Sequence, residues 1–88
     1  MDKNDKIALL TNQLEDDLVE RFGTLLGSSA LSKALGYSSV DALRQSITRA
    51  TVPVPVFKLP NRKGYFAFSK DVAIWLAQQY ELTRNSNE

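Results

Sequence analysis

Cysteine and histidine are both absent from the 88 residues. Their absence excludes disulfides, thiolate metal sites, cysteine nucleophiles and the side chain that most often serves as a general base. Carboxylate or serine chemistry remains, but the acidic run Glu15-Asp16-Asp17 is more typical of a solvated helix face than of an acid–base pair. We therefore expect a protein that is not an enzyme, with no catalytic residues, no metal and no cofactor.

Long apolar runs are also missing. No stretch approaches the roughly 20 apolar residues of a membrane span, and the charged residues 1–6 are not followed by a secretory hydrophobic core. We therefore expect a cytoplasmic protein with no membrane partner. Hydrophobic residues make up 43% of the chain and charged residues 24%, which favours a folded chain over a disordered one. A chain of this length makes one domain with a thin core, because only roughly 60% of the unfolded surface can be buried.

Acidic residues are scarce in the middle of the chain. Residues 23–70 carry seven lysines and arginines but a single acidic residue, Asp41. The flanks have the opposite balance, with six acidic residues against three basic ones in residues 1–22 and three against one in residues 71–88. A basic block of this kind favours a polyanionic partner, because each neutralised phosphate releases condensed counterions.

Helical periodicity is clearest in residues 5–22. Apolar residues recur there at helical spacing: Ile7, Leu10, Leu14, Leu18 and Phe22. Gly23 is typical of the glycine that ends a helix. A long coiled coil is not expected, since Asp17 and Arg21 stand where apolar residues would be needed. The apolar stripe of this acidic helix either packs on its own domain or mediates self-association.

Two short helices are predicted next. The Ser28-Ser29 pair supplies candidate N-caps for the first, and Gly36 ends it. Ser38 together with Asp41 resembles a capping box at the start of the second helix. A turn of about three residues between two short helices is the spacing of a helix-turn-helix.

The segment after these helices is predicted to form a β-hairpin. Pro53 and Pro55 end helix formation and favour extended backbone. Residues 54–59 and 65–68 are then the expected strands, joined by the basic turn 60–64. Alternation places Phe66 and Phe68 on one face of the second strand, where core packing is favoured over base stacking.

A last helix is predicted with Ser69 as its N-cap and with an apolar stripe at Val72, Trp75, Leu76 and Tyr80. The expected fold class is α+β, a small winged helix-turn-helix with three to four helices plus a two-stranded β-hairpin wing. Residues 1–22 are its acidic N-terminal helix, residues 23–82 the DNA-binding domain, and residues 83–88 a disordered tail.

Three segments carry a resemblance to a known family: Leu31–Ser38, Val52–Phe57 and Tyr65–Leu76. In this order they resemble the MerR-superfamily winged helix-turn-helix, and within it the small excisionase and AlpA-like regulators of phages and plasmids. The turn Leu35-Gly36-Tyr37-Ser38 and the closing run Asp71-Val72-Ala73-Ile74-Trp75-Leu76 carry most of the resemblance, which covers roughly residues 27–80. It implies that a helix from Ser39 to Ala50 enters the major groove of DNA and that residues 61–64 form the wing tip.

The candidate DNA contacts follow from this placement and from the charge distribution. Arg44 and Gln45 suit the edges of guanine and adenine, whereas the side chains one turn later suit phosphates. Arg62 and Lys63, adjacent cations in a turn, suit the minor groove or the backbone. The full candidate set is Lys33, Ser39, Arg44, Gln45, Thr48, Arg49, Lys58, Arg62 and Lys63.

The sequence thus predicts a sequence-specific double-stranded DNA-binding protein, associated with the nucleoid when bound, that regulates transcription on a mobile genetic element. One alternative is an excisionase-like recombination directionality factor that bends DNA. The other is a protein-interaction adaptor that uses the N-terminal helix. Besides double-stranded DNA, the partners considered are a second copy through the N-terminal helix and a recombinase or RNA polymerase.

Overall fold

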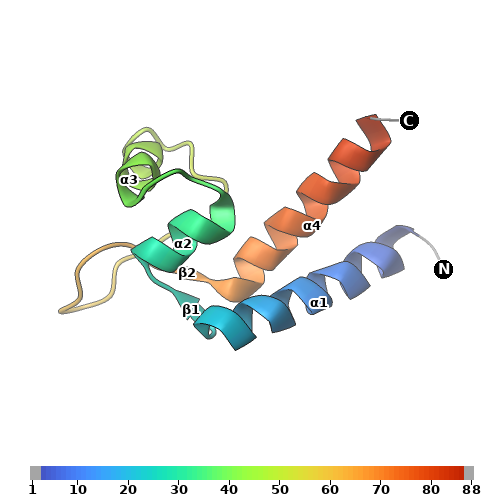
Figure 1. Ribbon diagram of the computed structural model, residues 1–88, viewed down its shortest axis with the longest axis horizontal. Helices are drawn as coiled ribbons and strands as arrows, with labels where there is room; N and C mark the ends of the chain where they lie inside the picture. The colour runs from blue at the N-terminus through green and yellow to red at the C-terminus, as the bar shows by residue number, and fades with distance from the viewer. Residues whose placement is uncertain (1–2, 87–88) are drawn as a thin grey trace.

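The computed structural model describes residues 3–86, and within them it shows a small α+β fold of four helices and one short sheet. The elements in chain order are α1 (Lys3–Phe22), β1 (Leu25–Leu26), α2 (Ser28–Leu35), α3 (Val40–Thr48), β2 (Ala67–Phe68) and α4 (Ser69–Ser86). The molecule has two parts (Figure 1): the long helices α1 and α4 lie at one end, and α2, α3 and the loop that follows them lie at the other. No helix in this range is both long and apolar enough to cross a membrane.

The two strands join residues that are far apart in the sequence. β1 and β2 are antiparallel, with Leu25 opposite Phe68 and Leu26 opposite Ala67. Just beyond them, the backbone N–H of Ser69 donates to the carbonyl of Thr24 at 2.8 Å. The strands therefore tie the start of α4 to the end of α1.

The predicted pairing of a two-stranded hairpin wing is wrong. Residues 65–68 were expected to pair with residues 54–59, but β2 pairs with β1, and the described residues of the two expected strands share only an isolated bridge between Phe57 and Phe66. Proline is the physical reason. Pro53 and Pro55 have no amide hydrogen, so the segment they start cannot extend a ladder of backbone hydrogen bonds.

The hydrophobic core contains residues from both parts of the molecule. Its buried members are Leu18, Leu26, Leu31, Leu43, Val54, Ala67, Val72 and Ala73. Leu14 and Phe22 of α1 pack against this cluster, as do Trp75 and Leu76 of α4. Leu14, Leu18 and Phe22 of the apolar stripe therefore pack on their own domain, whereas self-association through this helix stays a prediction.

Three features of the second half differ from the sequence prediction. Phe68 is 47% exposed, because β2 turns it to the outside of the sheet, where its ring lies 5.2 Å from that of Phe57. Tyr80, expected in the apolar stripe of the last helix, is 56% exposed. Residues 83–86 are helical rather than part of a disordered tail, since no glycine or proline after Gly64 stops the helix. Residues 87–88 of that expected tail lie outside the described residues.

Ser69, expected to cap α4, is instead the first residue of this helix, and its side chain connects the helix to α1. The hydroxyl donates a 2.6 Å hydrogen bond to the carbonyl of Gly23, and the residue is fully buried. Gly23 has a φ of +90°, which lets the chain leave α1 and turn into β1. One buried hydroxyl thus holds the ends of two helices together.

Replacing Ser69 with alanine removes this hydrogen bond and leaves the Gly23 carbonyl without it. We expect Ser69→Ala to lower the free energy of unfolding by about 1–2 kcal/mol. Urea denaturation measures the difference. Ser29→Ala is the matched control, since Ser29 is exposed on α2, and its effect should stay within about 0.5 kcal/mol. Equal effects of the two substitutions would show that the junction does not depend on the hydroxyl.

Candidate nucleic-acid interface

Helices α2 and α3 are joined by residues 36–39, as the sequence predicted. Gly36 has a φ of +84°, and the next N–H group, that of Tyr37, donates to the carbonyl of Ser32 at 2.9 Å. This left-handed glycine and the hydrogen bond that spans it form the Schellman motif that commonly ends a helix. The chain therefore reverses sharply between the two helices.

The N-termini of both helices differ from the expected caps. Gly27, not the Ser28-Ser29 pair, occupies the N-cap position of α2. Ser39, not Ser38, caps α3, and its hydroxyl accepts a 3.0 Å hydrogen bond from the N–H of Ala42. Ser39 was also predicted to contact DNA. A hydroxyl that accepts at a cap retains a proton to donate, so the two roles are compatible.

A chain of hydroxyl groups fixes α3 against the turn and against its own exit. The phenol oxygen of Tyr37 lies 2.7 Å from Oγ of Ser46, which lies 3.0 Å from Oγ1 of Thr51. Ser46 is buried on the inner face of α3. This network was not predicted from the sequence. The signal for it is that a half-buried tyrosine needs a partner for its hydroxyl, and a serine among inward apolar positions is a candidate partner.

The end of α3 repeats the Schellman motif with alanine in place of glycine. Ala50 has a φ of +58°, and the N–H of Thr51 donates to the carbonyl of Ser46 at 2.9 Å. Residues with a Cβ seldom adopt this conformation, because the left-handed region brings Cβ close to the carbonyl oxygen. Ala50, expected to be the last residue of the helix that starts at Ser39, instead lies exposed beyond the end of α3.

The outward face of α3 carries the side chains that the sequence singled out. Arg44, Gln45, Thr48 and Arg49 are all exposed, whereas Leu43 on the opposite face is fully buried. One polar surface of a short helix is therefore available to a partner. Lys33 is likewise exposed, on α2.

The loop from Phe57 to Phe66, here called the basic loop, replaces the predicted hairpin. Its base is closed by two backbone hydrogen bonds between Phe57 and Phe66, of 2.9 and 2.8 Å. Arg62 and Lys63 are exposed near its tip, beside Asn61, whose φ is +62°. The tip of the loop thus presents two adjacent cations, as expected of a wing.

Lys58, a further candidate contact, lies on the side of the basic loop. Its Nζ is 5.0 Å from the centre of the Tyr65 ring, within the range of a cation–π interaction. The stem of the side chain is therefore directed along the loop while its charge stays exposed.

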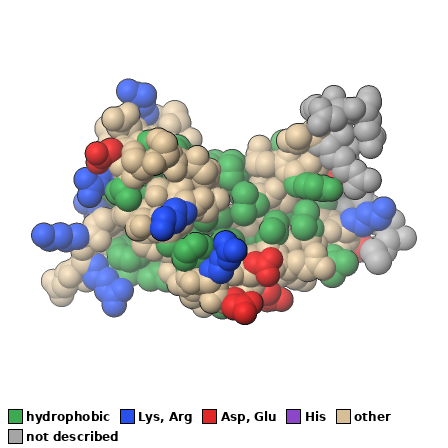
Figure 2. Space-filling model, in the orientation of Figure 1, with side chains coloured by type: hydrophobic (Ala, Val, Ile, Leu, Met, Phe, Trp, Pro, Cys, Tyr) green, Lys and Arg blue, Asp and Glu red, His purple; other side chains and the backbone are tan. Residues whose placement is uncertain are grey.

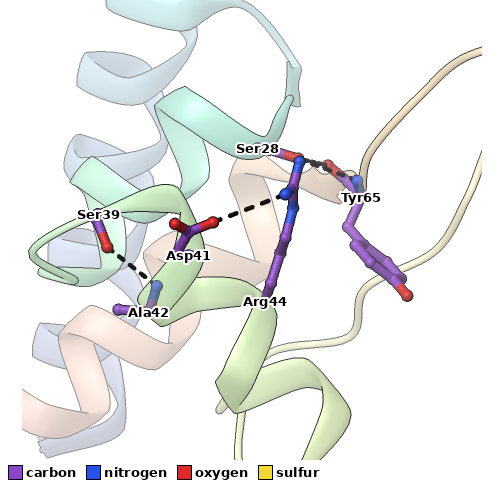
Figure 3. A network of polar contacts seen from close by, with 6 residues as sticks. All are labelled: Ser28, Ser39, Asp41, Ala42, Arg44 and Tyr65. Carbon is purple, nitrogen blue, oxygen red and sulfur yellow. Dashed lines mark hydrogen bonds and ion pairs between the residues drawn. The ribbon is translucent and has the colours of Figure 1, made fainter.

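The basic loop is anchored to the start of α2 (Figure 3). Oγ of Ser28 accepts a hydrogen bond from the N–H of Tyr65 at 3.1 Å and donates to the carbonyl of the same residue at 3.4 Å. Gly64, which precedes Tyr65, has a φ of +87°, and a Cβ there would lie 2.6 Å from Oγ of Ser28. Both the backbone conformation and the close approach therefore require glycine at this position.

The charges are separated in space as they are in the sequence. Figure 2 shows blue lysine and arginine side chains gathered at the end formed by α2, α3 and the basic loop, whereas red acidic side chains gather near α1. The exposed cations at that end are Lys33, Arg44, Arg49, Lys58, Arg62 and Lys63. Chemically, this surface suits a phosphate-bearing polymer, with guanidinium and amide groups able to bind base edges.

No protein-family model, curated protein or solved structure matches the chain.

Gly64→Ala should loosen the basic loop, because alanine there combines backbone strain with a steric clash. Gly36→Ala is the matched control, since Gly36 has nearly the same φ but no atom within 4 Å of a Cβ. We expect Gly36→Ala to lower the free energy of unfolding by about 1 kcal/mol and Gly64→Ala by about 2–3 kcal/mol. Chemical denaturation of each variant measures both values.

The double variant Ser28→Ala with Gly64→Ala tests why Gly64→Ala should lower the free energy of unfolding more than Gly36→Ala does. Removing Oγ relieves the clash, so the double variant should be no less stable than Gly64→Ala alone. If Gly64→Ala costs no more than Gly36→Ala, the contact with Ser28 does not anchor the loop.

Proposed function

We propose that this protein binds double-stranded DNA sequence-specifically, with α3 in the major groove and the basic loop against the backbone or the minor groove. The observation that carries this proposal is the exposed face of α3, where Arg44 and Gln45 lie one turn ahead of Thr48 and Arg49. The basic loop, which carries the exposed Arg62 and Lys63, lies at the same end of the molecule as α3 (Figure 1).

The dimensions of α3 suit this role. An α-helix with its side chains is about 10–12 Å across, and the major groove is roughly 12 Å wide. Arginine can donate two hydrogen bonds to O6 and N7 of guanine, and glutamine pairs in a similar way with adenine. Arg44 and Gln45 therefore supply sequence discrimination, whereas Thr48, Arg49 and Lys33 supply phosphate contacts.

The basic loop supplies affinity more than specificity. Its tip is short and cationic, and the minor groove displays a degenerate pattern of donors and acceptors. Arg62 and Lys63 therefore contribute through phosphate contacts or through the negative potential of a narrow minor groove.

Within this proposal, the biological role is regulation of transcription on a mobile genetic element. The resemblance of residues 27–80 to MerR-superfamily and AlpA-like regulators supports it. A recombination directionality factor would dock the same surface and would differ in where its sites lie and whether it bends them.

Duplex binding should depend strongly on salt. If about four phosphates are neutralised, the slope of log affinity against log salt concentration should be near −3.6. Arg62→Ala should weaken binding to specific and random duplexes by similar factors and make the slope shallower by roughly one unit. Fluorescence anisotropy with labelled duplexes over a salt series measures both effects.

Arg21→Ala is the matched control for this experiment, because Arg21 is an exposed arginine on α1, away from the proposed surface. It should leave the affinity and the salt slope nearly unchanged. A duplex affinity that does not vary with salt would exclude the proposed function, and equal losses in Arg21→Ala and Arg62→Ala would exclude the proposed surface.

A further inference from the structure

The basic block of residues 23–70 contains one acidic residue, Asp41, and it lies on the surface proposed to bind DNA. Oδ1 of Asp41 is 3.7 Å from Nη1 of Arg44, one helical turn further on (Figure 3). The two side chains are 83% and 62% exposed, so both are accessible to a partner. A carboxylate in such a position repels phosphates, and its presence there calls for a physical explanation.

Helix stability explains only part of the presence of a carboxylate at position 41. Asp41 stands in the first turn of α3, where a negative charge interacts favourably with the helix dipole. It does not complete a capping box, because Ser39 is the N-cap and Asp41 is only the second residue of the helix. An ion pair as exposed as Asp41–Arg44 contributes little to folding.

The ion pair has a larger effect on the orientation of the Arg44 side chain than on the stability of the helix. A guanidinium group is planar and has five N–H donors, so the ion pair of Nη1 with the Asp41 carboxylate at 3.7 Å favours orientations in which Nη1 faces Asp41, while leaving the N–H donors available to a second partner. Binding to guanine requires a fixed orientation, since both acceptors must be met at once. A free arginine on the same helix would also reach neighbouring phosphates.

We propose that Asp41 is a positioning residue for base recognition: it holds Arg44 in the orientation that binds a guanine and keeps it away from phosphates. The inference rests on the proposed function. Its ligand is a duplex with a G·C pair at the position that Arg44 contacts. Asp41 lowers the affinity for DNA of arbitrary sequence and raises the discrimination at this one base pair.

The experiment begins with selection of binding duplexes from a library with a random core, using the full chain. The selected duplex and its single base-pair substitutions are then titrated with the wild type, Asp41→Asn, Arg44→Ala and the double variant. Asp16→Asn is the matched control, because it removes the same charge from an exposed position on α1. Thermal unfolding of each variant separates effects on binding from effects on folding.

We expect Arg44→Ala to lose about tenfold or more in discrimination at one G·C pair, and Asp41→Asn to lose about twofold to fivefold at the same pair. Asp41→Asn should also bind random duplex about twofold to threefold more tightly, because one repulsive charge is gone. In the Arg44→Ala background, Asp41→Asn should change the discrimination no further. Asp16→Asn should change neither quantity.

Three results would overturn the proposal. In the first, Asp41→Asn retains full discrimination. In the second, Asp41→Asn loses discrimination at a different base pair, which would mean that Asp41 itself accepts from a cytosine amino group. In the third, Asp16→Asn raises the affinity for random duplex as much as Asp41→Asn does. Failure of the proposed function is a separate outcome, seen when the wild type retains no duplex from the library even at low salt. That result removes both proposals.

Discussion

The structure depends on a seam where residues 23–28 run antiparallel to residues 64–69. At one end of the seam, the hydroxyl of Ser69 donates to the carbonyl of Gly23. In its middle, β1 pairs with β2. At the other end, Ser28 binds both backbone groups of Tyr65. Of the described helices, α1 ends beside this seam and α2 and α4 begin in it, whereas α3 is joined to the far end of α2 by residues 36–39.

The seam has a mechanical consequence for the proposed DNA surface. α2 starts where the seam ends, and the basic loop returns to the seam at Gly64, so the loop and the α2–α3 pair share one base. The hydroxyl chain from Tyr37 through Ser46 to Thr51 then fixes α3 against the turn that joins it to α2 and against its own exit. The groups proposed to bind the two grooves of a duplex would need a fixed spacing, and the shared base holds α2 and the basic loop together.

The helices could be predicted from the sequence because their signals are local. Residues 5–22 have a strong apolar period, and Gly23 and Gly36 stop α1 and α2 at left-handed positions. The exposed side chains of α3 were also recovered, since the period that buries Leu43 turns Arg44 and Gln45 outward.

The pairing of the strands could not be predicted in the same way. β1 is two residues long, too short for an alternation pattern, and its partner lies some forty residues away. The aromatic residues of the basic loop suggested a hairpin. Their β propensity does not specify which strand lies next to them, because that propensity depends on the neighbouring strands. Ser28 and Ser46 were missed for a related reason: their partners, Tyr65 and Tyr37, are set by tertiary packing and not by local sequence.

The central claim is that α3 and the basic loop form one DNA-binding surface while the acidic helix α1 stays away from the duplex. Amide chemical shifts of the ¹⁵N-labelled protein, recorded as a duplex is added, test it residue by residue. The account predicts that the largest changes fall on the exposed face of α3, from Arg44 to Arg49, and on residues 61–64, with little change in α1. Changes concentrated in α1 and α4, with α3 unaffected, would contradict it.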